Sequence, residues 1–289
     1  MTAAASGLVV VDKPAGLTSH DVVSRVRRLA GTRKVGHAGT LDPMATGVLV
    51  LGVNRATRLL GHLMLTEKAY DATVRLGVAT TTDDAEGEVI ETASTAGLDE
   101  TAVRAALTGF VGEIEQVPTA VSAIKVDGKR AYQRVRDGEN VQLKARPVTV
   151  HELVVHDVRR EGDHLDVAIS VRCSSGTYIR AIARDLGARL GVGGHLTALR
   201  RTAVGPYDLG TARTLDQLGE KFALMPIAEA ARRAFPAREL DEAHAADVRV
   251  GRPLDLAVDG VTAVFDPAGE FLALYEPRNG AAKPVAVFV

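Results

Sequence analysis

The chain has 289 residues, a length that permits one large domain or two smaller ones. Hydrophobic residues make up 46% and charged residues 25%, as in an ordinary globular protein, and the formal net charge is −1. The single cysteine, Cys173, excludes an intramolecular disulfide framework and a multi-cysteine zinc site, and it fits a reducing compartment. Because the sequence shows no basic leader and no uncharged apolar run of about 18 residues, we expect a cytoplasmic protein without a membrane span.

The first segment of the chain predicts strands around one helix. Residues 8–11 form a short apolar strand that ends at Lys13-Pro14. Residues 18–21 read TSHD, which resembles a capping box, and the apolar residues that follow recur at helical spacing up to Gly31. Residues 47–53 read as a buried strand, and Asn54 is expected to cap a helix after it. Residues 70–76 alternate between apolar and polar or small side chains, which predicts a half-buried strand.

The middle of the chain predicts one helix, a pair of strands and a second helix. Residues 102–110 have a helical pattern, and Asp127-Gly128 is a turn signal. Two β-rich runs, 148–158 and 165–173, are joined by a polar turn. Residues 177–190 form an amphipathic helix that Gly191 should end.

The last part of the chain changes in character near residue 225. Residues 215–231 are predicted to be helical, and residues 241–250 form a second short helix. A hairpin is expected around the turn Asp266-Pro267-Ala268-Gly269, and residues 285–289 supply a last strand. The pattern predicts an α+β fold with a mixed or antiparallel central sheet in residues 1–225. A small, mostly β domain should occupy residues 235–289.

Charges are unevenly distributed along the chain. Residues 25–34 carry five basic side chains and no acid, residues 125–146 are also basic, and residues 83–100 carry seven acids and no base. A charge run is most often only a solvated face. Two basic segments on either side of a candidate site nevertheless favour a polyanionic partner, because lysine and arginine neutralise phosphates.

Several common active-site patterns are missing from the sequence. The eight histidines include no His-x-x-x-His pair, and a single cysteine cannot form Cys-x-x-Cys, so no dedicated metal site is expected. There is no Gly-x-Ser-x-Gly elbow and no Walker A motif. If the protein is an enzyme, we expect it to work with side chains and without a cofactor.

One glycine-rich stretch holds an acid and a histidine in unusual surroundings. Residues 35–49 read VGHAGTLDPMATGVL and place His37 and Asp42 among small and apolar neighbours. An isolated Asp-Pro pair most often caps a turn. Three further short stretches stand out beside it, namely VDKP at 11–14, KAY at 68–70 and CSSGTYIR at 173–180.

Taken together, these stretches resemble a known family. GHAGTLDPMATG, KAYDATVRLG, CSSGTYIRAIARDLG and GGHLTALRRTAVG occur in this order, across roughly residues 7–210, as in the TruB family of tRNA pseudouridine synthases. The resemblance implies the pseudouridine synthase fold, with a tail similar to a reduced PUA-like RNA-binding domain. It implies isomerisation of uridine to pseudouridine in the T arm of tRNA, at uridine-55, without a metal or redox cofactor. The implied partner is the T-arm stem-loop of tRNA, bound by a monomer that needs no other protein.

The resemblance also implies the reacting groups. Asp42 matches the family's nucleophile, and Arg180 matches the arginine that partners it. A carboxylate in a dry pocket has its pKa raised by desolvation and needs a nearby cation to stay ionised. Arginine suits this task because it keeps its proton and can bond both carboxylate oxygens. We therefore expect Arg180 to pair with Asp42 across the pocket.

The target base has to leave its stack before a carboxylate can reach it. Tyr70 matches the family's stacking tyrosine, which holds the extruded base and can help remove a proton. His37 matches the histidine that takes the vacated position in the RNA. Two further positions match contacts to the bound uridine, namely Tyr178 and Leu199. The supporting positions are Lys13, Pro14 and Gly39, of which the glycine leaves room for the nucleotide.

Two alternatives stay open at this point. The first is a non-catalytic RNA-binding or RNA-folding module, against which the complete set of Asp42, Arg180 and Tyr70 argues. The second is the core of a guide-RNA-dependent pseudouridylase. Assaying an Asp42→Asn protein for retained RNA binding tests the first alternative. Activity on a tRNA transcript without any guide or partner decides the second.

Overall fold

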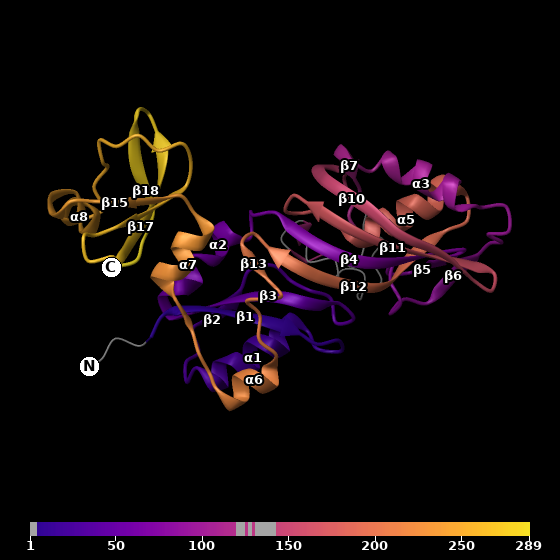
Figure 1. Cartoon of the computed structure of the whole chain (residues 1–289), viewed down its shortest axis with the longest axis horizontal. Helices are drawn as coiled ribbons and strands as arrows, with labels where there is room; N and C mark the ends of the chain where they lie inside the picture. Colours follow the sequence, from indigo (N-terminus) through magenta and orange to yellow (C-terminus); the bar gives the residue numbers. More distant parts are fainter. Residues whose placement is uncertain (1–4, 120–124, 127–128, 131–142) are drawn as a thin grey trace.

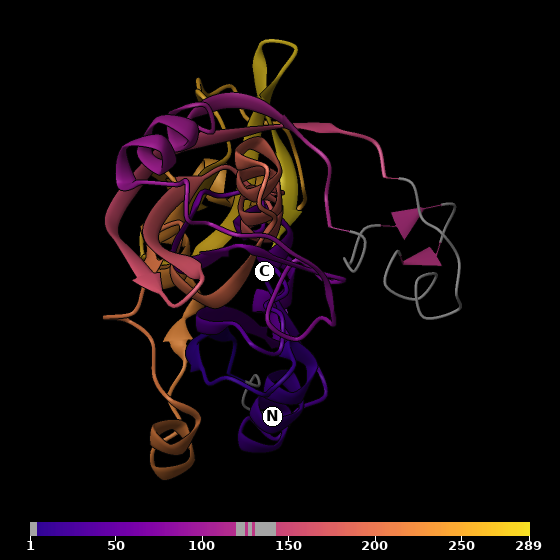
Figure 2. The ribbon, with the colours of Figure 1, turned by 90° about the vertical axis from the view of Figure 1, so that its right-hand side faces the viewer.

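The computed structural model describes residues 5–119, 125–126, 129–130 and 143–289 (Figure 1). The turn predicted at 127–128 and much of the basic segment 125–146 lie outside the described residues. Figure 2 shows the short strands β8 (Lys125–Val126) and β9 (Lys129–Arg130) standing apart from the rest of the molecule.

Within the described residues, a central sheet of ten strands forms the core of the molecule. Its main order is β14-β1-β3-β12-β4-β11-β10-β7, while β2 pairs with β3 and β13 pairs with β12. The strands are β1 (Gly7–Lys13), β2 (Val35–His37), β3 (Thr46–Val53), β4 (Lys68–Leu76), β7 (Gly112–Gln116), β10 (Arg146–Glu161), β11 (His164–Cys173), β12 (Gly194–Val204), β13 (Tyr207–Asp208) and β14 (Met225–Pro226). Neighbours pair antiparallel, except that β12 and β3 are parallel, so the sheet is mixed, as predicted.

The two faces of this sheet bury different partners. On β1, Val9 and Val11 belong to a hydrophobic cluster with helices α1 (Ser19–Leu29), α3 (Glu100–Thr108) and α5 (Ile179–Leu190). The alternate residues, Leu8 and Val10, belong to a second cluster with α2 (Leu60–Leu63) and α7 (Ile227–Ala234). Since both faces of β1 and β3 are covered, these strands are continuous apolar runs. Strand β4 instead alternates in burial along most of its length, as the sequence predicted.

The helices begin and end close to the predicted residues. Helix α1 has the expected capping box, in which Thr18 accepts a hydrogen bond from the Asp21 amide and the Asp21 side chain bonds back. Helix α5 begins two residues later than predicted because Tyr178 is its N-cap, and it ends at Gly191, whose φ is 72°.

Two local predictions are wrong. Asn54 does not cap a helix: it is the first residue of the 3-10 helix η1 (Asn54–Arg58), has a φ of 54°, and donates through its side chain to the Ala5 carbonyl. The single helix predicted for 215–231 is instead α6 (Leu215–Glu220), strand β14 and helix α7. It is interrupted because Met225 pairs with Leu8 on the edge of β1, and proline at 226 cannot continue a preceding helix.

The C-terminal part is a small four-stranded sheet with one helix. Its strands are β15 (Ala237–Glu239), β16 (Thr262–Phe265), β17 (Phe271–Arg278) and β18 (Ala281–Val287), and the helix is α8 (Glu242–Arg249). The predicted hairpin is present as β16 and β17, whereas the last strand begins four residues earlier than predicted. A separate two-stranded hairpin, β5 (Val78–Thr80) and β6 (Val89–Thr92), leaves the end of β4.

The small sheet packs on the rest of the molecule through the second hydrophobic cluster. Phe265, Phe271 and Phe288 share that cluster with α2 and α7, which lie between the two sheets in Figure 1. Arg55 donates to the Phe288 carbonyl at 2.7 Å, and the Arg58 guanidinium lies 5.3 Å from the Phe288 ring centre. The boundaries 1–225 and 235–289 stay a prediction.

Candidate active site

A cavity of about 330 Å³ brings together most of the predicted site residues. It is walled by the loop between β2 and β3, by strand β4, by the start of α5 and by strand β12. The predicted residues that line it are Gly39, Asp42, Tyr70, Tyr178, Arg180 and Leu199. Lys13, Pro14 and His37 do not line it.

Asp42 and Arg180 form the expected ion pair. The Arg180 Nε lies 3.1 Å from the Asp42 Oδ2, and Nη2 donates to Oδ1 at 3.4 Å, so the guanidinium meets both carboxylate oxygens. The Arg180 side chain is 6% exposed, whereas the Asp42 side chain keeps 35% of its surface open toward the cavity. The Arg180 guanidinium is therefore buried, whereas the Asp42 carboxylate is accessible from the cavity.

A second carboxylate contacts the same arginine. The Asp84 Oδ2 lies 3.2 Å from the Arg180 Nη1, which also donates to the Thr82 carbonyl at 2.8 Å. The Asp84 side chain is 4% exposed. The sequence placed Asp84 in an acidic run that we interpreted as a solvated face, and nothing in the run distinguishes this acid from its neighbours.

The charges around Asp42 act in opposite directions. Burial raises the pKa of Asp42 above its ordinary value of 3.8, and the Arg180 guanidinium opposes that rise. The negative charge of Asp84 raises the pKa further, while Lys13 and Arg201 lower it. Asp42 therefore depends on its cationic neighbours to be ionised, and Arg180 is the largest of these influences.

Tyr70 and Tyr178 reach the cavity from two different elements. Tyr70 is a buried residue of β4, and burial raises the pKa of its hydroxyl. The Tyr178 amide donates to the Gln116 Oε1 at 2.8 Å, and the Gln116 Nε2 donates to the Tyr178 carbonyl at 3.0 Å. Gln116, which the sequence did not single out, thus holds the start of α5 against the end of β7.

Lys13 supports the loop on the far side of Asp42. Its Nζ donates to the carbonyls of Pro14, Leu17 and Pro43 at 2.9, 2.6 and 3.1 Å. Burial lowers the pKa of Lys13 to about 8. These contacts agree with a supporting position, since they join the turn after β1 to the residue that follows Asp42.

His37 and the second cavity lie away from this cluster. His37 ends β2, and its ring packs edge-on against His20 with 5.7 Å between ring centres.

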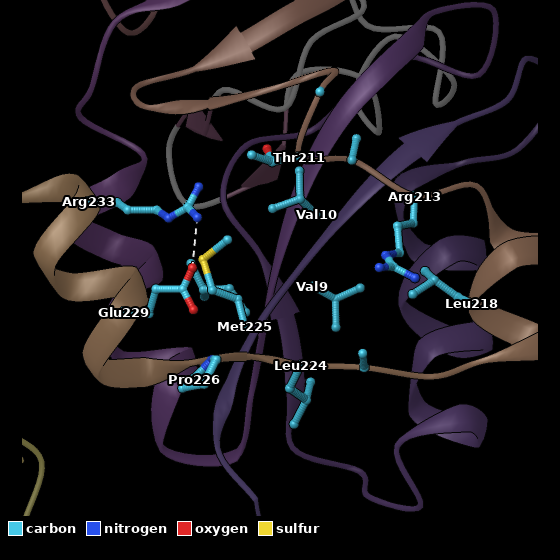
Figure 3. Close-up of a pocket in the computed structure, with 14 residues that line it drawn as sticks. Val9, Val10, Thr211, Arg213, Leu218, Leu224, Met225, Pro226, Glu229 and Arg233 are labelled. Atoms are coloured by element: carbon cyan, nitrogen blue, oxygen red, sulfur yellow. Dashed lines mark hydrogen bonds and ion pairs between the residues drawn. The ribbon is translucent and has the colours of Figure 1, made fainter.

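A second cavity, of about 360 Å³, follows the edge of β1 between β14, α6 and α7 (Figure 3). None of the predicted site residues lines it. Of the three charged residues that line it in the described part of the chain, Glu229 and Arg233 pair with each other at 2.7 Å, and the third is Arg213. The cavity at Asp42 is the candidate active site.

Comparison with family models covers nearly the whole chain. Residues 27–179 match the TruB family pseudouridylate synthase N-terminal domain. Residues 180–236 match the tRNA pseudouridylate synthase B C-terminal domain, and residues 235–289 match the C-terminal model of tRNA pseudouridine synthase II.

The chain belongs to the TruB family. The family predicted from the sequence is thereby confirmed.

Relatives of this TruB chain are similar along their full length. It is 59% identical over 295 residues to the tRNA pseudouridine synthase B of Arthrobacter sp., covering 98% of this chain and 96% of the relative. It is 60% identical over 289 residues to the protein of the same name from Thermobifida fusca, covering 98% and 99%. Among solved structures, a chain of a Cbf5-Nop10-Gar1 complex is similar with a TM-score of 0.75 at 26% identity, covering 98% of this chain and 85% of that one. The predicted fold class is confirmed.

The described residues of this TruB chain contain no group of three or more His, Cys, Asp or Glu side chains that could hold a metal ion. In the same part of the chain, no helix is long and apolar enough to cross a membrane.

Proposed function

We propose that this chain converts uridine-55 in the T arm of tRNA to pseudouridine, with Asp42 as the nucleophile. Isomerisation of uridine to pseudouridine in tRNA follows from family membership and from full-length relatives at about 60% identity; the position in the tRNA and the nucleophile are the proposal. The observation that carries the mechanism is the Asp42–Arg180 pair, which presents a carboxylate next to a buried guanidinium to a cavity of about 330 Å³. That volume lies within the range of small-ligand pockets.

The reaction breaks the C1′–N1 bond of the uridine and forms a C1′–C5 bond after the base has turned. The proton on C5 leaves and N1 gains one, so atoms balance and no electrons are exchanged with another molecule. A carboxylate suits this sequence because it can attack a carbon, hold the fragment covalently and leave again. Asp42 has to be ionised to attack, and Arg180 supplies the charge that keeps it so.

Tyr70, Tyr178 and Leu199 hold the extruded base in this proposal. All three line the cavity with Asp42, and two of them are aromatic. An aromatic face binds any base without reading its sequence. Tyr70 is also the candidate to accept the C5 proton, because it lines the cavity with Asp42 and the charge of Arg201 favours its ionised form. His37, at the end of β2, would take the place that the base leaves in the RNA.

The proposal also covers the domains, the RNA contacts and the oligomeric state. Residues 1–225 form the catalytic domain, and residues 235–289 form a PUA-like domain that contacts RNA. The phosphate contacts in this proposal are the basic residues of 98–144, many of which lie outside the described residues. The enzyme acts as a cytoplasmic monomer, and it needs neither a metal nor a protein partner.

A guide-RNA-dependent pseudouridylase core is the second candidate. The similar solved structures include one entitled a Cbf5-Nop10-Gar1 complex and one entitled an H/ACA RNP bound to a substrate RNA, at TM-scores of 0.75 and 0.73. Those chains are 26% and 25% identical to this one, whereas relatives named tRNA pseudouridine synthase B reach 59% and 60%. The higher identity favours action on tRNA without a guide.

Incubation of the pure protein with an unmodified tRNA transcript, followed by pseudouridine mapping, tests the proposal. We expect one pseudouridine, at position 55, and the same product from an isolated T-arm stem-loop. Asp42→Asn should give no product in a single turnover, while its tRNA affinity stays within about tenfold of wild type, or about 1.4 kcal/mol.

Each contrary result has a separate meaning. Product from Asp42→Asn contradicts the nucleophile assignment. A requirement for a guide RNA supports the second candidate. Tight tRNA binding by the wild-type protein without any turnover supports a non-catalytic RNA-binding module.

A further inference from the structure

We propose that Arg201 is a positioning residue for the isomerisation, whose buried guanidinium holds the loop that carries Asp42 against the strand that carries Tyr70. This inference rests on the proposed function for the roles of Asp42 and Tyr70. It assigns to Arg201 no bond to the reacting atoms.

The position of Arg201 in the sheet places it between the two reacting groups. On β12 it is the register partner of Tyr70 in β4 on one side and of Gly47 in β3 on the other. Gly47 is the second residue of β3, which begins directly after the loop 38–45 that contains Asp42. At this point β3 pairs parallel with β12, so Arg201 lies beside the residue where the chain leaves the Asp42 loop and enters the sheet.

The Arg201 side chain binds both ends of that loop. Its Nε donates to the Val48 carbonyl at 2.7 Å, its Nη1 to the Thr40 carbonyl at 3.3 Å, and its Nη2 to the Gly39 carbonyl at 3.1 Å. Residues 39–40 precede Asp42 and residue 48 follows it. A single planar group with donors in a rigid fork therefore sets the separation of the two ends.

A glycine at the end of this loop allows a close approach to Arg201. Gly47 has a φ of +98°, and a Cβ added there would lie 2.1 Å from the Arg201 carbonyl oxygen. Gly39 also has a positive φ, of +96°, but a Cβ there would make only an ordinary contact, 3.7 Å from the Arg201 Nη1. Main-chain packing against Arg201 therefore requires glycine at position 47, whereas residues 39–40 are held by the Arg201 side chain.

The charge of Arg201 is directed at the site rather than at a carboxylate partner. Residue Arg201 is 1% exposed, and among the described residues no carboxylate lies within ion-pair distance of it. A buried charge is costly unless it is well hydrogen-bonded, which the three carbonyls provide. The charge of Arg201 acts to lower the pKa of Tyr70 and the pKa of Asp42. It therefore acts on both groups, while no carboxylate of the described residues pairs with it.

Arg200 is a natural control. It is the preceding residue of β12, and its guanidinium pairs with the Asp12 carboxylate through contacts of 3.0 and 2.8 Å. Its side chain is 38% exposed, and it does not line the cavity. The two arginines lie on the same strand, carry the same charge and both donate hydrogen bonds. Arg200 binds the Asp12 carboxylate, whereas Arg201 binds main-chain carbonyls on either side of Asp42.

The test compares Arg201→Lys, Arg201→Met and Arg200→Lys. The measurements are the single-turnover rate on tRNA at saturating enzyme, the tRNA Kd, the melting temperature and the pH profile of the rate. We expect Arg201→Lys to bind tRNA within about threefold of wild type and to lose at least tenfold in rate, because an ammonium cannot span the three carbonyls. Arg201→Met should lose more, and its rate should rise with pH over a higher range, since Tyr70 then lacks the cation. Arg200→Lys should stay within about twofold in rate.

Amide hydrogen exchange provides a readout that does not depend on turnover. In Arg201→Lys, exchange should become faster at residues 39–48 and stay unchanged in β10 and β11, so the variant is informative even if Arg201→Met does not fold. A wild-type rate in Arg201→Lys, unchanged exchange at 39–48, or a rate loss matched by Arg200→Lys would overturn the inference. Absence of turnover in the wild-type protein on every tRNA would instead refute the proposed function. The exchange result would still decide whether Arg201 holds the loop.

Discussion

Replacing Arg180 by methionine removes the cation that lies between two carboxylates. In the native structure, the guanidinium is 3.1 Å from Asp42 and 3.2 Å from Asp84. Methionine keeps much of the volume and none of the charge. We expect the variant to fold, to be less stable than wild type, and to lose nearly all turnover.

The expected loss of stability can be worked from the exposure of the two acids. Breaking a buried ion pair by removing one partner costs about 3–5 kcal/mol. Asp84 is 4% exposed and should contribute most of this, whereas Asp42 is 35% exposed and is screened by water in the cavity. We therefore take about 3 kcal/mol near pH 8, which corresponds to a fall in melting temperature of about 6–12 °C at about 2–4 °C per kcal/mol for a chain of this size.

The loss should depend on pH with a defined sign. Without the guanidinium, the pKa of Asp42, already raised by burial, rises further in the folded variant. The folded variant then holds a proton that the unfolded chain releases above about pH 4. The stability of the variant consequently falls as the pH rises from the pKa of Asp42 in the unfolded chain to its higher pKa in the folded variant. The difference in melting temperature between wild type and variant should be larger at pH 8 than at pH 5.

The assay is thermal unfolding at pH 5 and pH 8, beside tritium release from tRNA labelled at C5 of uridine. Arg184→Met is the control, because this arginine is on the same helix and pairs with Asp83 and Asp185, but its side chain is 29% exposed. It should cost about 1 kcal/mol or less. Adding Asp84→Asn to Arg180→Met should restore part of the lost stability. An equal loss in the Arg180 and Arg184 variants, or a loss that is the same at both pH values, would refute the electrostatic reasoning.

Three further predictions concern the scaffold of the site. Gly47→Ala should destabilise the protein by several kcal/mol in urea unfolding, since its Cβ would lie 2.1 Å from the Arg201 carbonyl oxygen. The control Gly112→Ala has nearly the same φ with open space around it and should cost only about 1–3 kcal/mol. Equal losses in the two variants would refute a role for the contact with Arg201. Thr18→Ala removes a helix cap and should cost about 1 kcal/mol in thermal unfolding, so an unchanged melting temperature would contradict the cap's contribution. Burial lowers the pKa of Lys68 to about 8, so above pH 8 the unfolded chain holds a proton that the folded chain has lost, and this group makes stability rise with pH. Lys68→Met should remove that slope, at most about 1.4 kcal/mol per pH unit, in urea titrations at pH 8 and pH 9; an unaltered slope would show that another group causes it.

Local features of the fold could be predicted because their causes are local. The capping box at Thr18 depends on a residue three positions away, and the alternation of β4 depends on the pleat of one strand. The predictions for Asn54 and for residues 215–231 were wrong because distant segments decide them. Asn54 binds the Ala5 carbonyl, and the stretch before α7 is drawn to the edge of β1.

In the candidate active site too, some contacts could be predicted from the sequence and others depend on the fold. Family resemblance and the need of a buried carboxylate for a cation were enough to predict that Arg180 pairs with Asp42. Nothing in the acidic run 83–100 could show that Asp84 is buried against the same arginine, since its neighbours have the same charge. Burial of one acid among many follows from where the β5–β6 hairpin meets α5 and β12, and that meeting is made by the fold.

The sequence by itself determined which chemical groups this protein has, which family it belongs to and where most of its helices and strands begin. Only the tertiary structure decided which of two adjacent arginines faces the cavity. In a strand, neighbouring side chains point to opposite faces, so Arg200 and Arg201 had to separate. Which face became the active site was decided by register with β4 and β3, whose residues lie more than a hundred positions earlier in the chain. Pairing between distant strands is a property of the folded chain, and a pattern in one short segment carries no information about it.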